Sequence, residues 1–117
     1  MSERTVDRRM IRYSKPKDNI KNTLVTNRIG NFIFFGISRC NKDKGDAFNK
    51  QRGVMIAEQR ALLAEEDTEL EQIPETNIQV QHSWLRGKVH RDNVVQLLAV
   101  FDNIDGILFN KSTRHRR

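Results

Sequence analysis

The chain has 117 residues, the size of one domain, with 37% hydrophobic residues, 31% charged residues and a formal net charge of +6. This length can bury a core without disulfides or metals, and the low apolar share indicates a small core beneath a large charged surface. A single cysteine, Cys40, excludes an internal disulfide, and neither a secretory signal nor a membrane span of roughly 18 apolar residues is visible. We therefore expect a cytoplasmic protein without a membrane partner.

Charge is distributed unevenly along the chain. Residues 1–28 carry eight Lys or Arg and three acidic residues, for a net charge of +5. Residues 29–81 carry six and nine, for −3, and residues 82–117 carry seven and three, for +4. Six acidic residues fall within the segment 65–75. Basic ends around an acidic middle produce a field that steers charged partners.

The charge distribution and turn residues predict one domain with a basic extension at each end. Residues 1–19 are predicted to form a basic N-terminal arm, with a short strand around Met10 to Tyr13. Residues 20–110 are predicted to form a single α+β domain, and residues 111–117 a basic C-terminal tail. Pro16 interrupts the arm because proline fixes φ and removes a hydrogen-bond donor.

Two strands joined by a turn at Gly30 are predicted at the start of the domain. Residues 23–26 are β-branched or apolar, and residues 32–40 form an almost continuous apolar run. Because an exposed strand would alternate, this run indicates a central strand covered on both faces. Gly36 within it permits close approach by another element.

A helix is predicted from Asp46, a suitable N-cap, to about Glu66. At 100° per residue, its small residues form one narrow stripe: Gly53, Ala57, Ala61 and Ala64. Such a stripe lets a helix lie close on a sheet. We interpret it as a packing feature.

The second half of the domain predicts a strand and a second helix. Apolar residues alternate with polar ones from Ile78 to Trp84, which is typical of a half-buried strand. Residues 86–88 are predicted to turn, and Val94, Leu97, Leu98 and Phe101 have helical spacing. Residues 107–109 are predicted to pack as a short strand or extended segment. The resulting order, β-β-α-β-α with possible short terminal strands, favours an α+β two-layer sandwich.

The loop and first turn around residues 42–52 are a candidate anion site. Lys42, Lys44, Lys50 and Arg52 surround the start of the first predicted helix, where amide groups and the helix dipole favour phosphate. The spacing lacks the Gly-Lys-Ser/Thr of a Walker motif, and Asp43 with Asp46 would repel an anion. A solvated loop is the alternative interpretation.

No catalytic or metal-binding pattern accompanies this loop. Asn41, Asp43 and Asp46 do not match the EF-hand template, because Gly45 would be the fifth position and not the sixth. Cys40 could act as a nucleophile only beside a histidine such as His82, and a buried structural thiol is the simpler interpretation. The scattered histidines have no zinc-ligand spacing. We therefore expect no enzyme activity and no cofactor or metal.

Nucleic-acid binding is the favoured functional hypothesis, because basic ends could neutralise several phosphates. Tyr13 and Trp84 could stack bases if exposed, although Trp84 is in phase with buried strand positions. The predicted contacts are phosphate-backbone contacts to RNA or DNA, made by Arg4, Arg8, Arg9, Arg12, Lys42, Lys44, Lys50, Arg52, Arg114, Arg116 and Arg117.

The competing hypothesis is a protein-binding modulator or inhibitor of a host enzyme. In that case the acidic segment 65–75 would engage a basic patch on the partner, although a solvated connection explains the same residues. Oligomeric state is left open, since an apolar strand could meet another subunit only if it lay at a sheet edge.

Residues 37–64, ISRCNKDKGDAFNKQRGVMIAEQRALLA, carry a distinctive combination of features. A strand ends at Cys40, an Asp-containing loop and Phe48 follow, and Gly53 opens an alanine-rich helix after Lys50 and Arg52. This combination resembles a strand, loop and helix module of small accessory, host-takeover type proteins of tailed bacteriophages. The resemblance implies a viral protein in the host bacterial cytoplasm that binds nucleic acid or redirects a host enzyme. It implies no catalytic residue.

Overall fold

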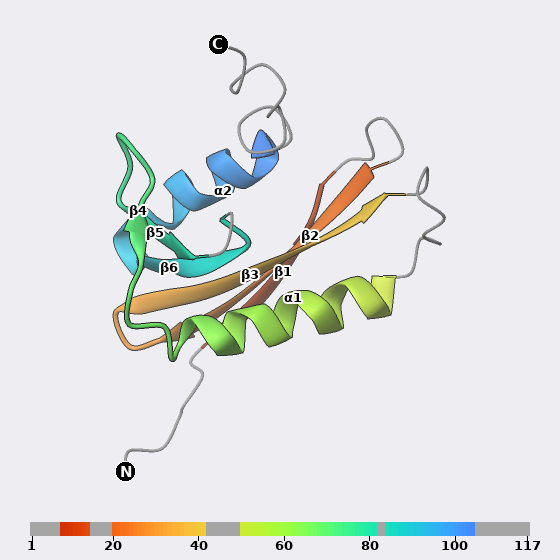
Figure 1. Cartoon of the computed structure of the whole chain (residues 1–117), viewed down its shortest axis with the longest axis horizontal. Helices are drawn as coiled ribbons and strands as arrows, with labels where there is room; N and C mark the ends of the chain where they lie inside the picture. The colour runs from red at the N-terminus through yellow and green to blue at the C-terminus, as the bar shows by residue number, and fades with distance from the viewer. Residues whose placement is uncertain (1–7, 15–19, 42–49, 82–83, 105–117) are drawn as a thin grey trace.

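The structure is a computed structural model that describes residues 8–14, 20–41, 50–81 and 84–104 (Figure 1). Its strands are β1 (Arg8–Tyr13), β2 (Ile20–Ile29), β3 (Phe32–Asn41), β4 (Glu71–Gln72), β5 (Ile78–Gln81) and β6 (Arg86–His90). Its helices are α1 (Lys50–Ala64), a short 3-10 helix (Arg91–Asn93) and α2 (Val94–Asp102).

The strands form one antiparallel sheet of six strands in the order β1-β2-β3-β6-β5-β4. The predicted α+β class is confirmed, and the sheet contains more strands than the sequence indicated. The helices α1 and α2 lie on opposite faces of the sheet (Figure 1). Helix α1 therefore adds a layer to the expected two-layer arrangement, and β3 is central and covered on both faces, as predicted.

The hairpin of β2 and β3 is the longest pairing in the sheet. It runs from the pair Ile20–Asn41 to the pair Ile29–Phe32, where Gly30 and Asn31 form the turn. Gly30 has a φ of 64°, the left-handed conformation that glycine adopts without a steric penalty. A two-residue turn with glycine first is typical of tight β-hairpins.

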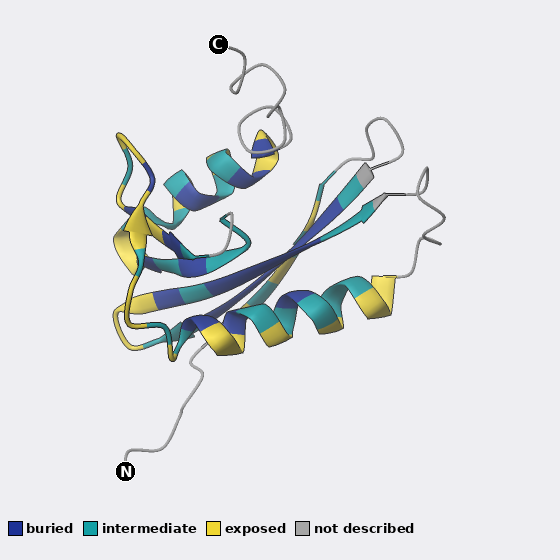
Figure 2. Ribbon diagram, in the orientation of Figure 1, coloured by how far each residue is buried: buried dark blue, intermediate teal, exposed yellow. Residues whose placement is uncertain are grey.

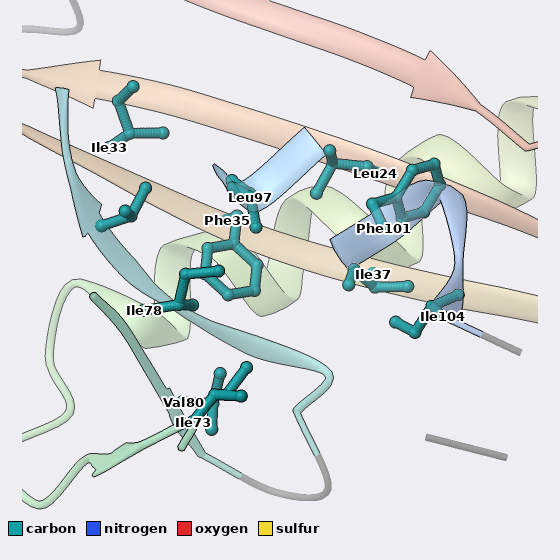
Figure 3. Packing of buried hydrophobic residues seen from close by; sticks show 11 residues of the cluster. Leu24, Ile33, Phe35, Ile37, Ile73, Ile78, Val80, Leu97, Phe101 and Ile104 are labelled. Carbon is teal, nitrogen blue, oxygen red and sulfur yellow. The ribbon is translucent and has the colours of Figure 1, made fainter. Parts of the chain in front are cut away.

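The main hydrophobic core lies between the sheet and α2. Side chains from β2, β3, β5 and β6 meet residues of α2 and its continuation (Figure 3). The cluster consists of Leu24, Ile33, Phe35, Ile37, Ile73, Ile78, Val80, Val89, Leu97, Phe101 and Ile104. The predicted helical positions Leu97 and Phe101 are both 1% exposed, so the periodicity identified the buried face of α2 correctly.

Helix α1 lies very close to the other face of the sheet. Ala57, Ala61 and Ala64 are buried, as the dark stripe on α1 in Figure 2 illustrates. A Cβ atom on Gly36 would lie 2.0 Å from the Ala57 carbonyl oxygen and 2.5 Å from the Ala61 nitrogen. Ser38 Oγ donates a hydrogen bond of 2.8 Å to the Gly53 carbonyl oxygen. The predicted small-residue stripe is therefore a packing surface.

The turn predicted at residues 86–88 is wrong, because these residues belong to β6. Gly87 pairs with Phe35 of β3 and Val80 of β5 inside the sheet. A Cβ atom on Gly87 would lie 2.0 Å from the Gln79 carbonyl oxygen, so the glycine permits a close backbone approach and does not mark a turn. The alternation of Gly87 and Val89 with polar residues was the strand signal available in the sequence, and both residues are buried in the structure.

The predicted short strand near Met10 to Tyr13 is β1, which pairs with β2 from Arg8 to Tyr13. The sheet therefore includes part of the segment interpreted as an N-terminal arm. The predicted N-cap Asp46, the predicted extended segment 107–109 and the predicted C-terminal tail 111–117 all lie outside the described residues.

Candidate nucleic-acid interface

The basic side chains of β1 alternate between the two faces of the sheet. Arg9 Nη2 lies 2.9 Å from Glu58 Oε1 of α1. Arg12 Nε and Nη2 donate bonds of 3.0 Å and 2.8 Å to the Asp102 carboxylate of α2. Two arginines predicted to contact phosphate therefore each have a carboxylate partner on a helix. Nothing local in the sequence signals these pairs, whose members are 49 and 90 positions apart.

The contact between Arg12 and Asp102 shifts the pKa of each side chain. The hydrogen bonds from Arg12, followed by its charge, lower the pKa of Asp102 below the ordinary 3.8. The same bonds raise the pKa of Arg12. The two-pronged geometry favours the charged forms of both groups, so this pair persists at neutral pH.

An aromatic and basic cluster lies where β1 ends and α1 begins. Tyr13 is 38% exposed. The Nζ atoms of Lys21 and Lys50 each lie 5.1 Å from the centre of its ring. Three elements position this cluster: Tyr13 ends β1, Lys21 lies near the start of β2, and Lys50 is the first residue of α1. We call Tyr13, Lys21 and Lys50 the tyrosine–lysine cluster.

An open hollow of about 290 Å³ lies beside this cluster, between β1 and α1. Its lining consists of Tyr13, Lys50, Gln51, Val54, Met55 and Glu58. Met55 is 56% exposed, and Glu58 is paired with Arg9. The hollow thus combines apolar side chains with one ammonium group, that of Lys50, and with the carboxylate of Glu58, which is paired with Arg9.

This arrangement suits an anion attached to a flat, apolar group. Ammonium groups on flexible stems can follow a phosphate, and a cation–π contact at an exposed site contributes only about 0.5–1 kcal/mol, so a phosphate can displace it. The ring and the methionine side chain offer surfaces on which a base can stack.

The other residues predicted to bind nucleic acid are less informative. Arg52 is exposed on α1, and Arg8 begins β1. Arg4, Lys42, Lys44, Arg114, Arg116 and Arg117 lie outside the described residues. Lys42 and Lys44 belong in sequence to the connection between β3 and α1, and Lys50 follows it. The structure therefore brings Lys50 beside Tyr13 and Lys21, of which Lys21 was missing from the predicted site.

The acidic segment is partly used in folding. Arg86 Nε and Nη2 of β6 lie 2.8 Å and 3.2 Å from the Asp67 carboxylate, and both side chains are less than one fifth exposed. Glu69 accepts a hydrogen bond at its carbonyl oxygen from Gln81. In contrast, the residues Glu66, Glu69, Glu71 and Glu75 are exposed. One carboxylate of the segment therefore has a structural role, while four face solvent.

Trp84 and Cys40 are both half-buried. Trp84 is half-buried and packs against the main hydrophobic cluster. Cys40 is half-buried in β3 opposite Lys21 of β2. Within the described ranges, no three His, Cys, Asp or Glu side chains are grouped so that they could hold a metal ion. His82, the histidine considered as a catalytic partner of Cys40, lies outside the described ranges.

Comparison of the chain with protein families, with curated proteins and with solved structures finds no match. In the part of the chain that the structure describes, no helix has the length and apolar character required to cross a bilayer.

Proposed function

We propose that this is a non-catalytic nucleic-acid-binding protein whose most ordered contact is the tyrosine–lysine cluster. The observation that carries the proposal is an exposed aromatic ring with two ammonium groups 5.1 Å from its centre, beside an open hollow. Base stacking on an aromatic side chain combined with neutralisation of the backbone is the usual mode of single-strand recognition.

In this proposal the basic residues differ in how directly they contact the nucleic acid. Arg9 and Arg12 have carboxylate partners, so they contribute to the general field more than to direct contacts. The basic residues near both ends of the sequence supply further phosphate contacts without sequence preference. The bacteriophage resemblance supports action on host or phage gene expression.

The proposal is tested by titrating a labelled single-stranded oligonucleotide at two salt concentrations. We expect the double variant Lys21→Gln/Lys50→Gln to weaken binding at low salt. It should also reduce the salt slope by about 0.7 for each lost phosphate contact on a single strand. Tyr13→Leu should weaken binding at both salt concentrations, because stacking contributes about 1–3 kcal/mol per base and depends little on salt.

Lys88→Gln is the matched control for the lysine variants. Lys88 Nζ also lies 5.1 Å from the centre of an aromatic ring, that of Phe32, and Lys88 pairs with Phe34 towards the opposite end of β3. The control removes one positive charge from a similar contact outside the cluster, where the double variant removes two. Equal effects per charge removed would show that only net charge matters. Absence of binding by the unaltered protein at low salt would refute the proposal.

The second candidate function is modulation of a partner protein by the acidic segment. It is favoured by one observation, the exposure of Glu66, Glu69, Glu71 and Glu75 on the connection that Asp67 fixes to β6. A pull-down from nuclease-treated bacterial lysate separates the two functions. A partner retained by the unaltered protein but lost by the variant with all four glutamates changed to Gln would support modulation.

A further inference from the structure

The two edges of the sheet differ greatly in length. One edge is β4, which has two residues, and the other is β1, which has six. Among the described residues, no strand pairs with the outer side of β1. A six-residue edge leaves a row of backbone donors and acceptors available for another strand.

The hydrogen-bond pattern identifies which residues of β1 face outward. Ser14 N donates a bond of 2.9 Å to the Asn22 carbonyl oxygen, so the pair 14–22 is hydrogen-bonded. In an antiparallel ladder, hydrogen-bonded and non-bonded pairs alternate. The backbone groups of Met10 and Arg12 therefore form hydrogen bonds to β2. Those of Arg9, Ile11 and Tyr13 lie in the plane of the sheet and point towards its open edge.

The usual protection of an edge strand is weakened here. Charged side chains normally discourage pairing between edges. In β1, Arg9 is held by Glu58 of α1 on one face and Arg12 by Asp102 of α2 on the other. Both side chains are thus held towards the helices above and below the strand and away from its open edge, although each keeps its charge. Ile11 is 40% exposed and Tyr13 is 38% exposed.

We propose that two copies of this chain pair through β1 as a symmetric, antiparallel dimer centred on Ile11, which continues the sheet across both copies. The symmetry of the dimer follows from the geometry of the edge. A two-fold axis that joins antiparallel edges is perpendicular to the sheet, so each symmetric register is centred on a single residue.

Charge selects the register among the three possible centres in the middle of β1. Centring on Met10 would place Arg8 opposite Arg12 of the second copy, and centring on Arg12 would place that arginine opposite itself. Like charges directly opposite each other destabilise a sheet. Centring on Ile11 places Arg9 opposite Tyr13, Met10 opposite Arg12, and Ile11 opposite Ile11, so no cation opposes a cation.

The backbone favours the same register. Centring on Ile11 pairs all the outward-facing residues with one another: Ile11 with itself, and Arg9 with Tyr13 in both directions. Centring on Met10 would pair Ile11 with Arg9 and would leave Tyr13 without a partner among the described residues. Centring on Arg12 would pair Ile11 with Tyr13 and would leave Arg9 without one. The register that avoids charge repulsion therefore also forms the most hydrogen bonds. It places both α1 helices on one face of the continuous sheet.

The dimer is tested by measuring the mass of the full chain after nuclease treatment, with light scattering or sedimentation. A protein concentration of roughly 100 μM is suitable, because it lies far above a dimer dissociation constant in the micromolar range. We expect twice the 13.7 kDa of the single chain. Ile11→Pro should restore the single mass, because it removes an outward N–H at an edge position where proline is tolerated. Ile11→Lys should do the same by opposing two cations.

Val95→Lys is the control, since Val95 is an apolar residue of α2 that is 74% exposed. It should leave the dimer intact, and circular dichroism should show that all variants fold. A single mass for the unaltered chain would overturn the proposal. A dimer that survives both Ile11 variants in folded form would also overturn it.

The register is tested by cysteine cross-linking in a Cys40→Ser background. In the proposed dimer, the Cα atoms of residue 11 in the two copies lie about 5.5 Å apart, within the range of a disulfide. Those of residue 13 are offset by four positions along the strands, about 13 Å, which is beyond the range of a disulfide. A mild oxidant should therefore cross-link Ile11→Cys and not Tyr13→Cys. The reverse result would overturn the register. None of these measurements depends on nucleic-acid binding.

Discussion

Arg9 and Arg12 show how alternation along a strand distributes charge between two layers. They are three positions apart on β1, so they project from opposite faces, and each reaches a carboxylate on the helix of that face. Both pairs are exposed, and exposed ion pairs generally contribute little to stability. Their effect is positional, because they connect the edge strand to α1 and α2.

The Arg12–Asp102 pair predicts how stability depends on pH. Because the pKa of Asp102 is lowered in the folded state, this carboxylate stabilises the fold above the ordinary pKa of 3.8. That contribution disappears as the pH falls through the lowered value. Asp102→Asn should thus lower the Tm by an amount on the order of a few °C at pH 6, and by progressively less below pH 4.

Thermal unfolding of both proteins from pH 2.5 to 7 measures this difference. Glu69→Gln is a suitable control, since Glu69 is exposed and its described hydrogen bond uses the backbone. A Tm difference between Asp102→Asn and the unaltered chain that is constant across this range would contradict the assigned role of the carboxylate.

Residue-scale prediction from the sequence succeeded for local features and failed for distant ones. The short strand around Tyr13 follows from β-forming residues within four positions. Lys21 and Lys50, however, approach Tyr13 only after β1, β2 and α1 have packed. The sequence identified Lys50 through its place near the start of a helix and had no signal for Lys21. Side-chain partners across the fold depend on strand order, which periodicity does not encode.

At the scale of elements, glycines have two distinct roles that their sequence context does not separate. Gly30 allows a tight turn, whereas Gly36 and Gly87 allow backbones to approach inside the sheet. The apolar run around Gly36 made its role predictable. Gly87 lies between Arg86 and Lys88, which resembles a polar turn, and this is why β6 was not predicted. The charged neighbours are accommodated because Arg86 pairs with Asp67 and Lys88 contacts Phe32.

The contact between α1 and β3 predicts a strong effect of a single methyl group. Gly36→Ala would place its Cβ 2.0 Å from a backbone oxygen of α1, so the helix must shift away from the sheet. Overpacking typically costs 1–3 kcal/mol, and we expect about 3 kcal/mol here because the obstacle is backbone. Urea unfolding of the purified variant measures this loss.

Gly30→Ala provides the comparison for this variant. Gly30 has open space around its Cβ position and only its positive φ opposes the change, which should cost about 1–2 kcal/mol. A larger loss at Gly30 than at Gly36 would mean that the helix–sheet contact is looser than described.

At the scale of the whole molecule, α+β architecture was predictable and the arrangement of layers was not. Periodicity identified both helices and the central strand, because each buries a regular stripe or face. It indicated neither that α1 and α2 cover opposite faces of the sheet nor that β6 pairs with β3. The strand order brings β6, far along the chain, beside the N-terminal hairpin.

The two proposals together predict how binding depends on the length of a nucleic acid. In a dimer centred on Ile11, two tyrosine–lysine clusters belong to one sheet, and a strand long enough to reach both binds with increased avidity. Linked sites can exceed single-site affinity by 10²–10⁴-fold. We expect Ile11→Pro to lower the affinity for a strand of about 30 nucleotides at least tenfold. The affinity for a strand of about 10 nucleotides should stay nearly unchanged, because a single-strand site in OB-fold proteins covers about 4–16 nucleotides and so short a strand reaches one cluster.

Fluorescence anisotropy with both oligonucleotides at one salt concentration measures this dependence. Ile11→Pro does not change the charge of the protein. A loss of affinity for the long strand alone therefore reports binding to two clusters at once. An equal loss for both lengths would place Ile11 itself in the nucleic-acid contact. An unchanged affinity for both lengths would show that the long strand does not bridge two clusters of a dimer.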